Sequence, residues 1–146
     1  MAPFRFRLEQ VRLYRKQLEE QAMQALAEAV SLRDSLVAGR EAIQREQAVQ
    51  RERLARAETL TAAERWLIQS YSNALKEDLI SVENRLDLAE EEVDRCRTEL
   101  IQKSQDRELL DTLKEKQTAR HRELERQKEQ RDFDETATLR YKPAAF

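Results

Sequence analysis

Apolar and small side chains recur at alternating steps of four and three residues, the heptad spacing of a helix that packs against a partner helix. In the first half of the chain, interrupted by Arg15, they are Phe4, Leu8, Val11, Leu18, Ala22, Ala25, Ala29, Leu32, Leu36, Gly39 and Ile43. In the second half they are Ile68, Tyr71, Leu75, Leu79, Val82, Leu86, Ala89, Val93, Cys96 and Leu100, and the spacing continues through Lys103, Arg107 and Leu110. We call these two stripes the first and second seam, and they predict two long helices.

The stretch that best favours a turn lies near residues 58–62, between the two seams. Thr61 and Glu64 have the spacing of a capping box, in which each side chain accepts a hydrogen bond from the other residue's backbone N–H. Gly39 lies on the first seam, and we expect it to be packed inside a helix, at a cost of about 1 kcal/mol relative to alanine. The pattern predicts one domain over 1–146, with helices over about 4–58 and 62–138, a turn at about 59–61 and a frayed C-terminal tail.

The two seams face each other in an antiparallel hairpin if the chain folds at residue 59, so that the numbers of paired residues add up to 118. The resulting apolar layers are Leu8–Leu110, Leu18–Leu100, Ala22–Cys96, Ala25–Val93, Ala29–Ala89, Leu32–Leu86, Leu36–Val82 and Ile43–Leu75. Heptad seams also match after a shift of seven residues. We predict an all-α, long antiparallel two-helix coiled-coil hairpin, in close contact at the small layers and looser at Gln47 and Gln50.

This pairing leaves the end of the second helix without a partner. Phe4 lies opposite Lys114, so about 24 residues project beyond it, roughly 36 Å at 1.5 Å per residue. The projecting segment is mostly charged, and pairs at i, i+4 stabilise such a helix by only about 0.2–0.5 kcal/mol each. We expect it to fray alone and to become ordered inside a partner.

Composition excludes several classes of protein. Aromatic residues make up 5% of the chain and charged residues 38%, with one glycine and two prolines, which excludes a sheet protein and disfavours a chain that encloses a substrate pocket. The net charge of −2 argues against a dedicated nucleic-acid or membrane-surface binder. No apolar run is long enough for a membrane span or a signal peptide, so we expect a cytoplasmic protein.

Candidate chemistry is sparse. A single glycine cannot form a phosphate-binding loop, and His121 with Glu125 is an isolated pair at helical spacing, so we expect no metal, no cofactor and no catalytic residue. Cys96 lies on the second seam and is interpreted as a small buried residue. The carboxylates of Asp134 and Glu135 fit a salt bridge to a partner or a solvated helix better than acid–base chemistry.

The densest apolar patch directly follows the turn and comprises Trp66, Leu67, Ile68 and Tyr71. Ile68 and Tyr71 lie on the second seam, so Trp66 and Leu67 cannot both be buried there. An exposed tryptophan is typical of a binding surface, and packing at the turn is the equal alternative.

Residues at both ends resemble a known family. They are Phe4-Arg5-Phe6-Arg7-Leu8-Glu9-Gln10-Val11, Tyr14-Arg15, Leu110, Leu113-Lys114-Glu115-Lys116, Glu123, Glu125, Glu129-Gln130, Asp134-Glu135, Ala137 and Arg140-Tyr141. This pattern, with Asp-Glu-x-Ala as its most specific part, resembles FliJ, the coiled-coil component of the bacterial flagellar export apparatus. The resemblance covers nearly the whole chain, although any charged coiled coil would match its middle.

The resemblance implies a non-enzymatic stalk that inserts the free ends of its helices into the hexamer of the export ATPase FliI and activates it. It also implies contacts with the export gate protein FlhA and with export chaperones, and a peripheral location at the cytoplasmic face of the inner membrane without direct insertion. The implied ATPase-binding residues are Phe4, Arg7, Arg126, Gln130, Asp134, Glu135 and Arg140. The implied gate-binding residues are Trp66, Leu67, Tyr71 and Leu75, with Ser72 as an alternative neighbour.

Three other interpretations stay open. A stalk of an injectisome type III secretion system would share the hairpin with fewer of the end motifs. A generic coiled-coil scaffold would pair its seams between two chains and would sediment as a dimer, whereas the stalk is expected to be a monomer on its own. An enzyme is the third alternative.

Overall fold

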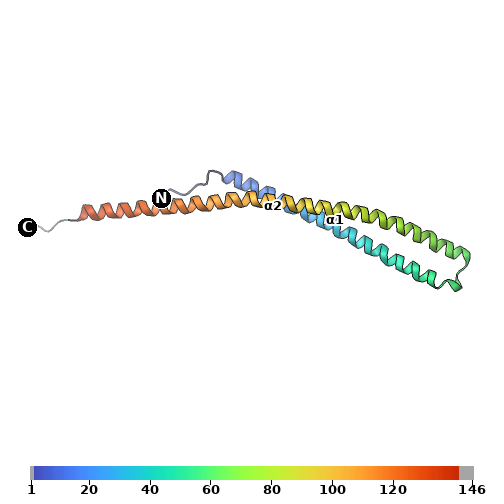
Figure 1. Cartoon of the computed structure of the whole chain (residues 1–146). Helices are drawn as coiled ribbons and strands as arrows, with labels where there is room; N and C mark the ends of the chain where they lie inside the picture. Colours follow the sequence, from blue (N-terminus) through green and yellow to red (C-terminus); the bar gives the residue numbers. More distant parts are fainter. Residues whose placement is uncertain (1, 142–146) are drawn as a thin grey trace, which may run out of the picture. The chain divides into compact units, whose positions relative to one another are not determined.

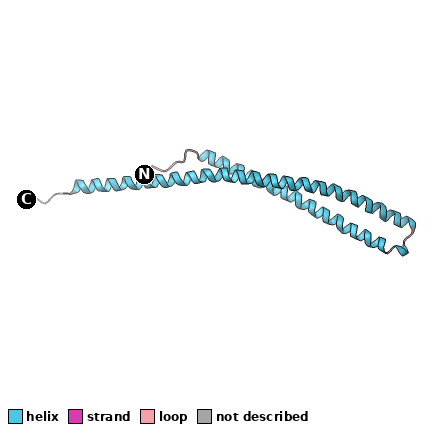
Figure 2. Ribbon diagram, viewed as in Figure 1, coloured by secondary structure: helices cyan, strands magenta, loops and turns pink. Residues whose placement is uncertain are grey.

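The computed structural model describes residues 2–141, which form two long α-helices joined by a short connection. Helix α1 spans Glu9–Ala55, a single 3-10 turn η1 spans Ala57–Thr59, and α2 spans Ala62–Arg140 (Figure 1). Within 2–141 there is no β-strand (Figure 2). The predicted all-α helical hairpin is therefore confirmed. The predicted frayed tail lies mostly in residues 142–146, outside the described residues.

Helix α1 begins at Glu9, five residues later than predicted, because residues 2–6 have no regular secondary structure and residues 7–8 form a turn. Alternate side chains of an extended segment share one face, whereas residues two apart on a helix point in nearly opposite directions. Phe4 and Phe6 can therefore both turn inward, and the structure makes Phe4 half-buried and Phe6 buried. The backbone N–H of Glu9 donates to the Phe6 carbonyl at 3.1 Å and closes the turn that starts the helix.

The connection between the helices contains the predicted capping box. The backbone N–H of Thr61 donates to Glu64 Oε2 at 3.3 Å, and the N–H of Glu64 donates to Thr61 Oγ1 at 3.2 Å. These two bonds satisfy backbone donors that the first turn of α2 would otherwise leave without a partner. Helix α1 ends at Ala55, three residues before the predicted end, because the chain tightens into η1.

The contacts divide the chain into two compact units. Unit 1 comprises Met1–Glu19 and Gln102–Phe146, and unit 2 comprises Glu20–Ile101. Each contains a stretch of both helices. Unit 2 holds almost all of the buried apolar side chains, whereas Phe6 is the buried apolar side chain of unit 1 among residues 2–141. That both units act as one domain stays a prediction.

The second seam is confirmed along most of α2. In unit 2 its buried members are Leu75, Leu86, Ala89, Val93 and Cys96. Burial raises the pKa of the Cys96 thiol, and the neighbouring Glu92 carboxylate raises it further. Tyr71 is the exception, because its side chain is exposed and Ser72 takes the inward position.

The first seam is only half correct. Ala22 and Ala29 are buried as predicted, but Ala25 and Leu32 are exposed. Their places are taken by the next residues along the helix, Leu26 and Arg33, which are partly buried. Leu26 buries more apolar surface than Ala25 would, and the aliphatic stem of Arg33 can cover the seam while its charged end reaches water.

The register of the hairpin also differs from the prediction. Ala29 packs in a core cluster with Val93 and Cys96, not with Ala89. In unit 1 the ion pairs Glu9–Lys114, Arg12–Asp111 and Arg15–Asp106 join the helices. The residue numbers add up to 121–123 in these ion pairs, and to 122 and 125 for Ala29 with Val93 and Cys96. Compared with the predicted sum of 118, α1 is shifted along α2 by three to seven residues, within the shift that heptad spacing permits.

Two residues in the second half of α1, Gln50 and Gly39, differ from the predicted packing. Gln50, predicted to be in a loose layer, is 2% exposed, and its Nε2 donates to Glu46 Oε1 at 3.0 Å. Gly39 lies inside α1 as predicted, but a Cβ atom built there would have no neighbour within 4 Å. The lack of a side chain at Gly39 is therefore not needed for close packing of α1 against α2.

Candidate partner-binding surfaces

Unit 1 is joined mainly by ion pairs. Six side chains of alternating charge follow one another across the two helices: Lys114, Glu9, Arg12, Asp111, Arg107 and Glu19. The distances between charged atoms are 3.0 Å for Lys114–Glu9, 2.6 Å for Glu9–Arg12, 3.3 Å for Arg12–Asp111 and 2.7 Å for Arg107–Asp111. The guanidinium of Arg107 also donates to Glu19. We call these six residues the ion-pair network.

The network shifts the pKa values of its carboxylates. Hydrogen bonds from Arg12 and then Lys114 lower the pKa of Glu9 to about 2. Burial acts to raise the pKa of Asp111, but hydrogen bonds from Arg107 and Arg12 together outweigh it and lower that pKa. Both acids are therefore held in the charged form, which is the form that binds α1 to α2.

Of the two predicted ATPase-binding residues at the start of the chain, Phe4 contacts α2. The rings of Phe4 and His121 are 5.5 Å apart between centroids, with an interplanar angle of 41°. Arg7 lies in the turn that starts α1 and is exposed. We call residues 2–8 the N-terminal strap.

Beyond His121, no hydrogen bond, ion pair or ring contact joins the described residues of the N-terminal strap or of α1 to α2. Helix α2 continues to Arg140, so 19 residues project, fewer than predicted because of the shifted register. They span roughly 28 Å at 1.5 Å per residue. Among the predicted residues here, Arg126 donates to Glu123 at 2.8 Å and Gln130 donates to Asp134 at 3.1 Å. We call residues 122–140 the projecting end.

Local hydrogen bonds alone support the projecting end among the described residues. Thr136 and Thr138 donate to the carbonyl oxygens one turn back, of Asp132 and Asp134, both at 2.8 Å. Glu135 and Arg140 are exposed. Of the predicted ATPase-binding residues, Phe4 thus contacts His121, directly before this segment, and five others lie along it, whereas Arg7 precedes α1 and is exposed.

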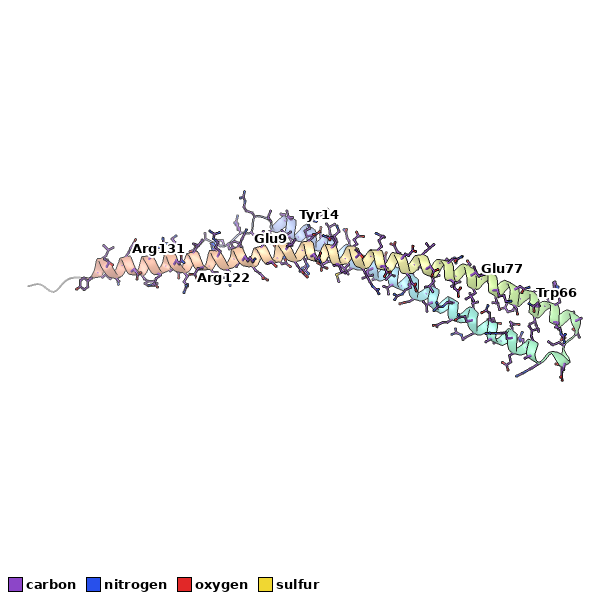
Figure 3. All side chains as sticks on the ribbon, in the orientation of Figure 1. Glu9, Tyr14, Trp66, Glu77, Arg122 and Arg131 are labelled. Carbon is purple, nitrogen blue, oxygen red and sulfur yellow. The ribbon has the colours of Figure 1, made fainter. Side chains whose placement is uncertain are left out.

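The predicted gate-binding residues lie in unit 2, on the first turns of α2. Trp66 is 68% exposed, Leu67 60% and Tyr71 46% (Trp66 is labelled in Figure 3). We call these three residues the tip patch. Leu75 is only 6% exposed, so it belongs to the seam and offers a partner no surface while the helices are paired. No exposed surface of Leu75 therefore supports its assignment as a gate-binding residue.

A groove beside the tip patch was not predicted. It has a volume of about 450 Å³ and is lined by Arg53, Arg56, Thr59, Leu60, Glu64, Leu67 and Ile68. Its residues come from the end of α1, from the connection and from the start of α2, so the folded turn is needed to form it. Sequence periodicity identifies the residues that pack, but it does not describe a hollow formed by the turn.

The described residues offer little for metal chemistry. Within 2–141, no three His, Cys, Asp or Glu side chains are gathered as metal ligands would be. His121 contacts Phe4, which gives this side chain a packing role. None of the described helices combines the length and apolar character that crossing a membrane requires.

Comparison with known proteins gives one match. The sequence model of a family described as "Flagellar FliJ protein" matches residues 4–145, nearly the entire chain. Neither the curated proteins nor the solved structures contain a significant match to this chain.

Proposed function

Because the chain belongs to the FliJ family of flagellar proteins, we propose that it is a stalk that inserts the projecting end of α2 into the hexamer of the flagellar export ATPase FliI and activates it. The family itself consists of non-enzymatic components of the flagellar export apparatus. The flagellar match favours this role over that of an injectisome stalk, and a hairpin that pairs its own helices favours it over a scaffold with seams paired between chains.

The observation that carries the proposal is the projecting end. A helix held only by local hydrogen bonds and pairs such as Arg126–Glu123 is weakly stable in water. It gains most from an environment that surrounds it, such as the central pore of a ring. Its charged side chains suit polar pore walls, and we assign ATPase contacts to Arg126, Gln130, Asp134, Glu135 and Arg140.

The N-terminal strap belongs to the same proposed surface. Phe4 packs on His121 directly before the projecting end, and Arg7 is exposed in the same strap. A ring that surrounds the projecting end would meet these residues next.

A second surface is proposed for the export gate. The tip patch exposes three large apolar side chains on one stretch of helix, and tryptophan and tyrosine are enriched among residues that dominate binding energy. We propose that it binds the gate protein FlhA and that export chaperones exchange on the same protein. Binding to the gate would place the protein at the cytoplasmic face of the inner membrane, without insertion.

The test is ATP hydrolysis by the purified export ATPase at low enzyme concentration, titrated with this protein. We expect stimulation together with a shift of the ATPase toward the hexamer in sedimentation. Charge reversal at Arg126 and Arg140 should reduce stimulation, whereas reversal at two exposed arginines of unit 2, Arg65 and Arg85, should not. If the variant reversed at Arg126 and Arg140 stimulates ATP hydrolysis fully, the projecting end does not activate the ATPase. If the unaltered protein does not stimulate ATP hydrolysis, the proposed function is rejected.

A further inference from the structure

One face of α2 in unit 1 carries exposed leucines and basic residues at heptad spacing. Its members are Leu109, Leu113, Lys116, Arg120, Leu124, Gln127 and Arg131, and all seven are exposed. We call them the leucine–basic stripe. The steps between them are three or four residues, so on an ideal helix of 3.6 residues per turn they fall within roughly 80° of arc. No acidic residue of α2 between 109 and 131 falls within this arc.

The stripe differs from the face that contacts α1. The contacts to α1 and to the N-terminal strap come from Asp106, Arg107, Asp111, Lys114 and His121. None of the seven residues is a proposed ATPase contact; Arg126 and Gln130 lie to one side of the arc, whereas Asp134, one step beyond Arg131, falls within it. Helix α2 in unit 1 thus has a seam toward α1 and a separate, uncovered stripe.

The apolar part of the stripe is a real hollow in the surface. A groove of about 730 Å³ is lined by Gln105, Glu108, Leu109, Leu110, Thr112, Leu113 and Lys116. Leu109 is 70% exposed and Leu124 is 54% exposed. A partner that covered these two side chains would remove their exposed apolar surface from water.

The basic part of the stripe is free to bind acids. Lys116, Arg120 and Arg131 form no ion pair with any residue of 2–141, in contrast to Arg12, which binds two carboxylates, and Arg107, which binds three. The nearest acid in angle, Glu123, already accepts hydrogen bonds from Arg126 and Gln127. Intramolecular pairing therefore leaves three positive charges along the same line as three leucines.

We infer that the leucine–basic stripe binds an acidic amphipathic helix of a partner protein, which lies along α2 and forms a third helix of the bundle in unit 1. The leucines at heptad spacing can pack against a partner helix whose apolar residues have the same spacing. The unpaired lysine and arginines favour a partner that carries carboxylates beside those apolar residues. This inference goes beyond the stalk function, because none of the seven stripe residues is among the proposed ATPase and gate contacts.

Charge favours this occupant over two others. A membrane surface attracts clustered positive charge, but the stripe is one residue wide, and the chain as a whole carries a net charge of −2. A second copy of the chain could offer its own acidic stretch over 77–99. That stretch, however, lies on the helix that already packs its apolar seam against α1 in unit 2.

The test uses the full chain and two synthetic helical peptides of four heptads, with leucine at the a and d positions and either glutamate or lysine at the e and g positions. Binding is measured by fluorescence anisotropy of the labelled peptide. We expect the glutamate peptide to bind at least about tenfold more tightly than the lysine peptide, a difference of about 1.4 kcal/mol. The double variant Lys116→Glu with Arg120→Glu should reverse that preference.

The matched control is Lys76→Glu with Arg122→Glu, which makes the same charge change at exposed positions away from the stripe. The control should bind like the unaltered chain. A second variant, Leu109→Ser, should weaken both peptides and keeps the test valid if the charge variant loses helicity.

Three results would overturn the inference. They are absence of binding of the glutamate peptide, equal binding by the stripe and control variants, and self-association of the unaltered chain in sedimentation that the stripe variant loses. Binding to vesicles of anionic lipid that only the stripe variant loses, without peptide binding, would assign the stripe to a membrane. None of these measurements involves the export ATPase, so failure here is distinguishable from failure of the proposed function.

Discussion

The ring of Phe4 packs against the ring of His121, with 5.5 Å between their centroids. This contact fixes the N-terminal strap on α2 and marks where the projecting end begins. Aromatic pairs contribute about 0.5–1.5 kcal/mol beyond the area that they bury.

We predict that His121→Ala loosens the N-terminal strap without unfolding the hairpin. Hydrogen exchange should speed up at the start of α1, where the N–H of Glu9 depends on Phe6, and should stay unchanged in unit 2. The neighbouring change Arg122→Ala, at an exposed position, is the control. Equal exchange in both variants would mean that the aromatic contact does not hold the strap.

The shifted register makes a prediction about two alanines. Ala29→Leu should destabilise the hairpin by about 1–3 kcal/mol, because an enlarged side chain must fit against Val93 and Cys96. Ala25→Leu should change the free energy of unfolding by less than about 0.5 kcal/mol, since Ala25 is exposed. Urea unfolding of both variants measures the difference, and the opposite order would restore the register in which numbers add up to 118.

Gly39→Ala should stabilise the protein. The substitution removes backbone freedom from the unfolded chain and adds a methyl group that has no neighbour within 4 Å. The expected gain is about 0.5–1 kcal/mol, seen as a higher midpoint of thermal or urea unfolding. A loss of stability would show that the helices approach each other closely at this point.

The ion-pair network should weaken in acid. The pKa of Glu9 is about 2 in the folded protein, below its ordinary value of 4.5. Its contribution to stability is therefore fully present above pH 4.5 and is lost as the pH falls toward 2. Hydrogen exchange over 9–19 should depend more steeply on pH in this range for the unaltered chain than for Glu9→Gln.

Glu20→Gln makes the same change at an exposed position outside the network and serves as the control. Raising the salt concentration toward 1 M, where charges are screened beyond about 3 Å, should also speed exchange over 9–19. If the pH dependence is the same in all three proteins, Glu9 does not hold the helices together.

Trp66→Ala tests the tip patch. We expect weaker binding to the purified cytoplasmic part of the gate protein by about tenfold or more, as for an aromatic residue at the centre of an interface. The melting temperature should change little, because Trp66 is 68% exposed. Leu88→Ala, a change at an exposed apolar residue of α2 outside the patch, is the control. A large drop in melting temperature would instead assign Trp66 to packing at the turn.

The sequence predicts the helices and the second seam well. Along α2 the seam is dominated by large apolar residues such as Leu86 and Val93, and their spacing identifies the packed face. Tyr71 was misplaced because an aromatic residue fits the heptad pattern better than Ser72, although only the smaller residue faces inward.

Along α1 the pattern is weaker, since Ala25 and Leu26 are adjacent and both fit a heptad with a small change of phase. The N-terminal strap was missed for a different reason. The heptad pattern makes Phe4 the first position of a helical seam, whereas the alternation of Phe4 and Phe6 with arginines is the period of an extended segment.

Which residues form the seams could be predicted better than which partners they meet. Two repeating apolar stripes match equally well at offsets of seven, so the pattern of leucines and alanines contains no preference among offsets. The predicted length of the projecting end was wrong for this reason, because that length depends on the offset between the helices.

The ion-pair network distinguishes one alignment from its neighbours. If α2 slid by seven residues in one direction, Arg12 would meet Ser104 and Glu19 would meet Leu100; in the other direction, Arg12 would meet Thr118 and Arg15 would meet Leu113. After either slide, some half-buried charges would face neutral groups. Leaving these charges unpaired costs more free energy than a solvated ion pair contributes. The unequal spacing of these charges therefore selects one register, and the register determines how far α2 extends beyond the start of α1.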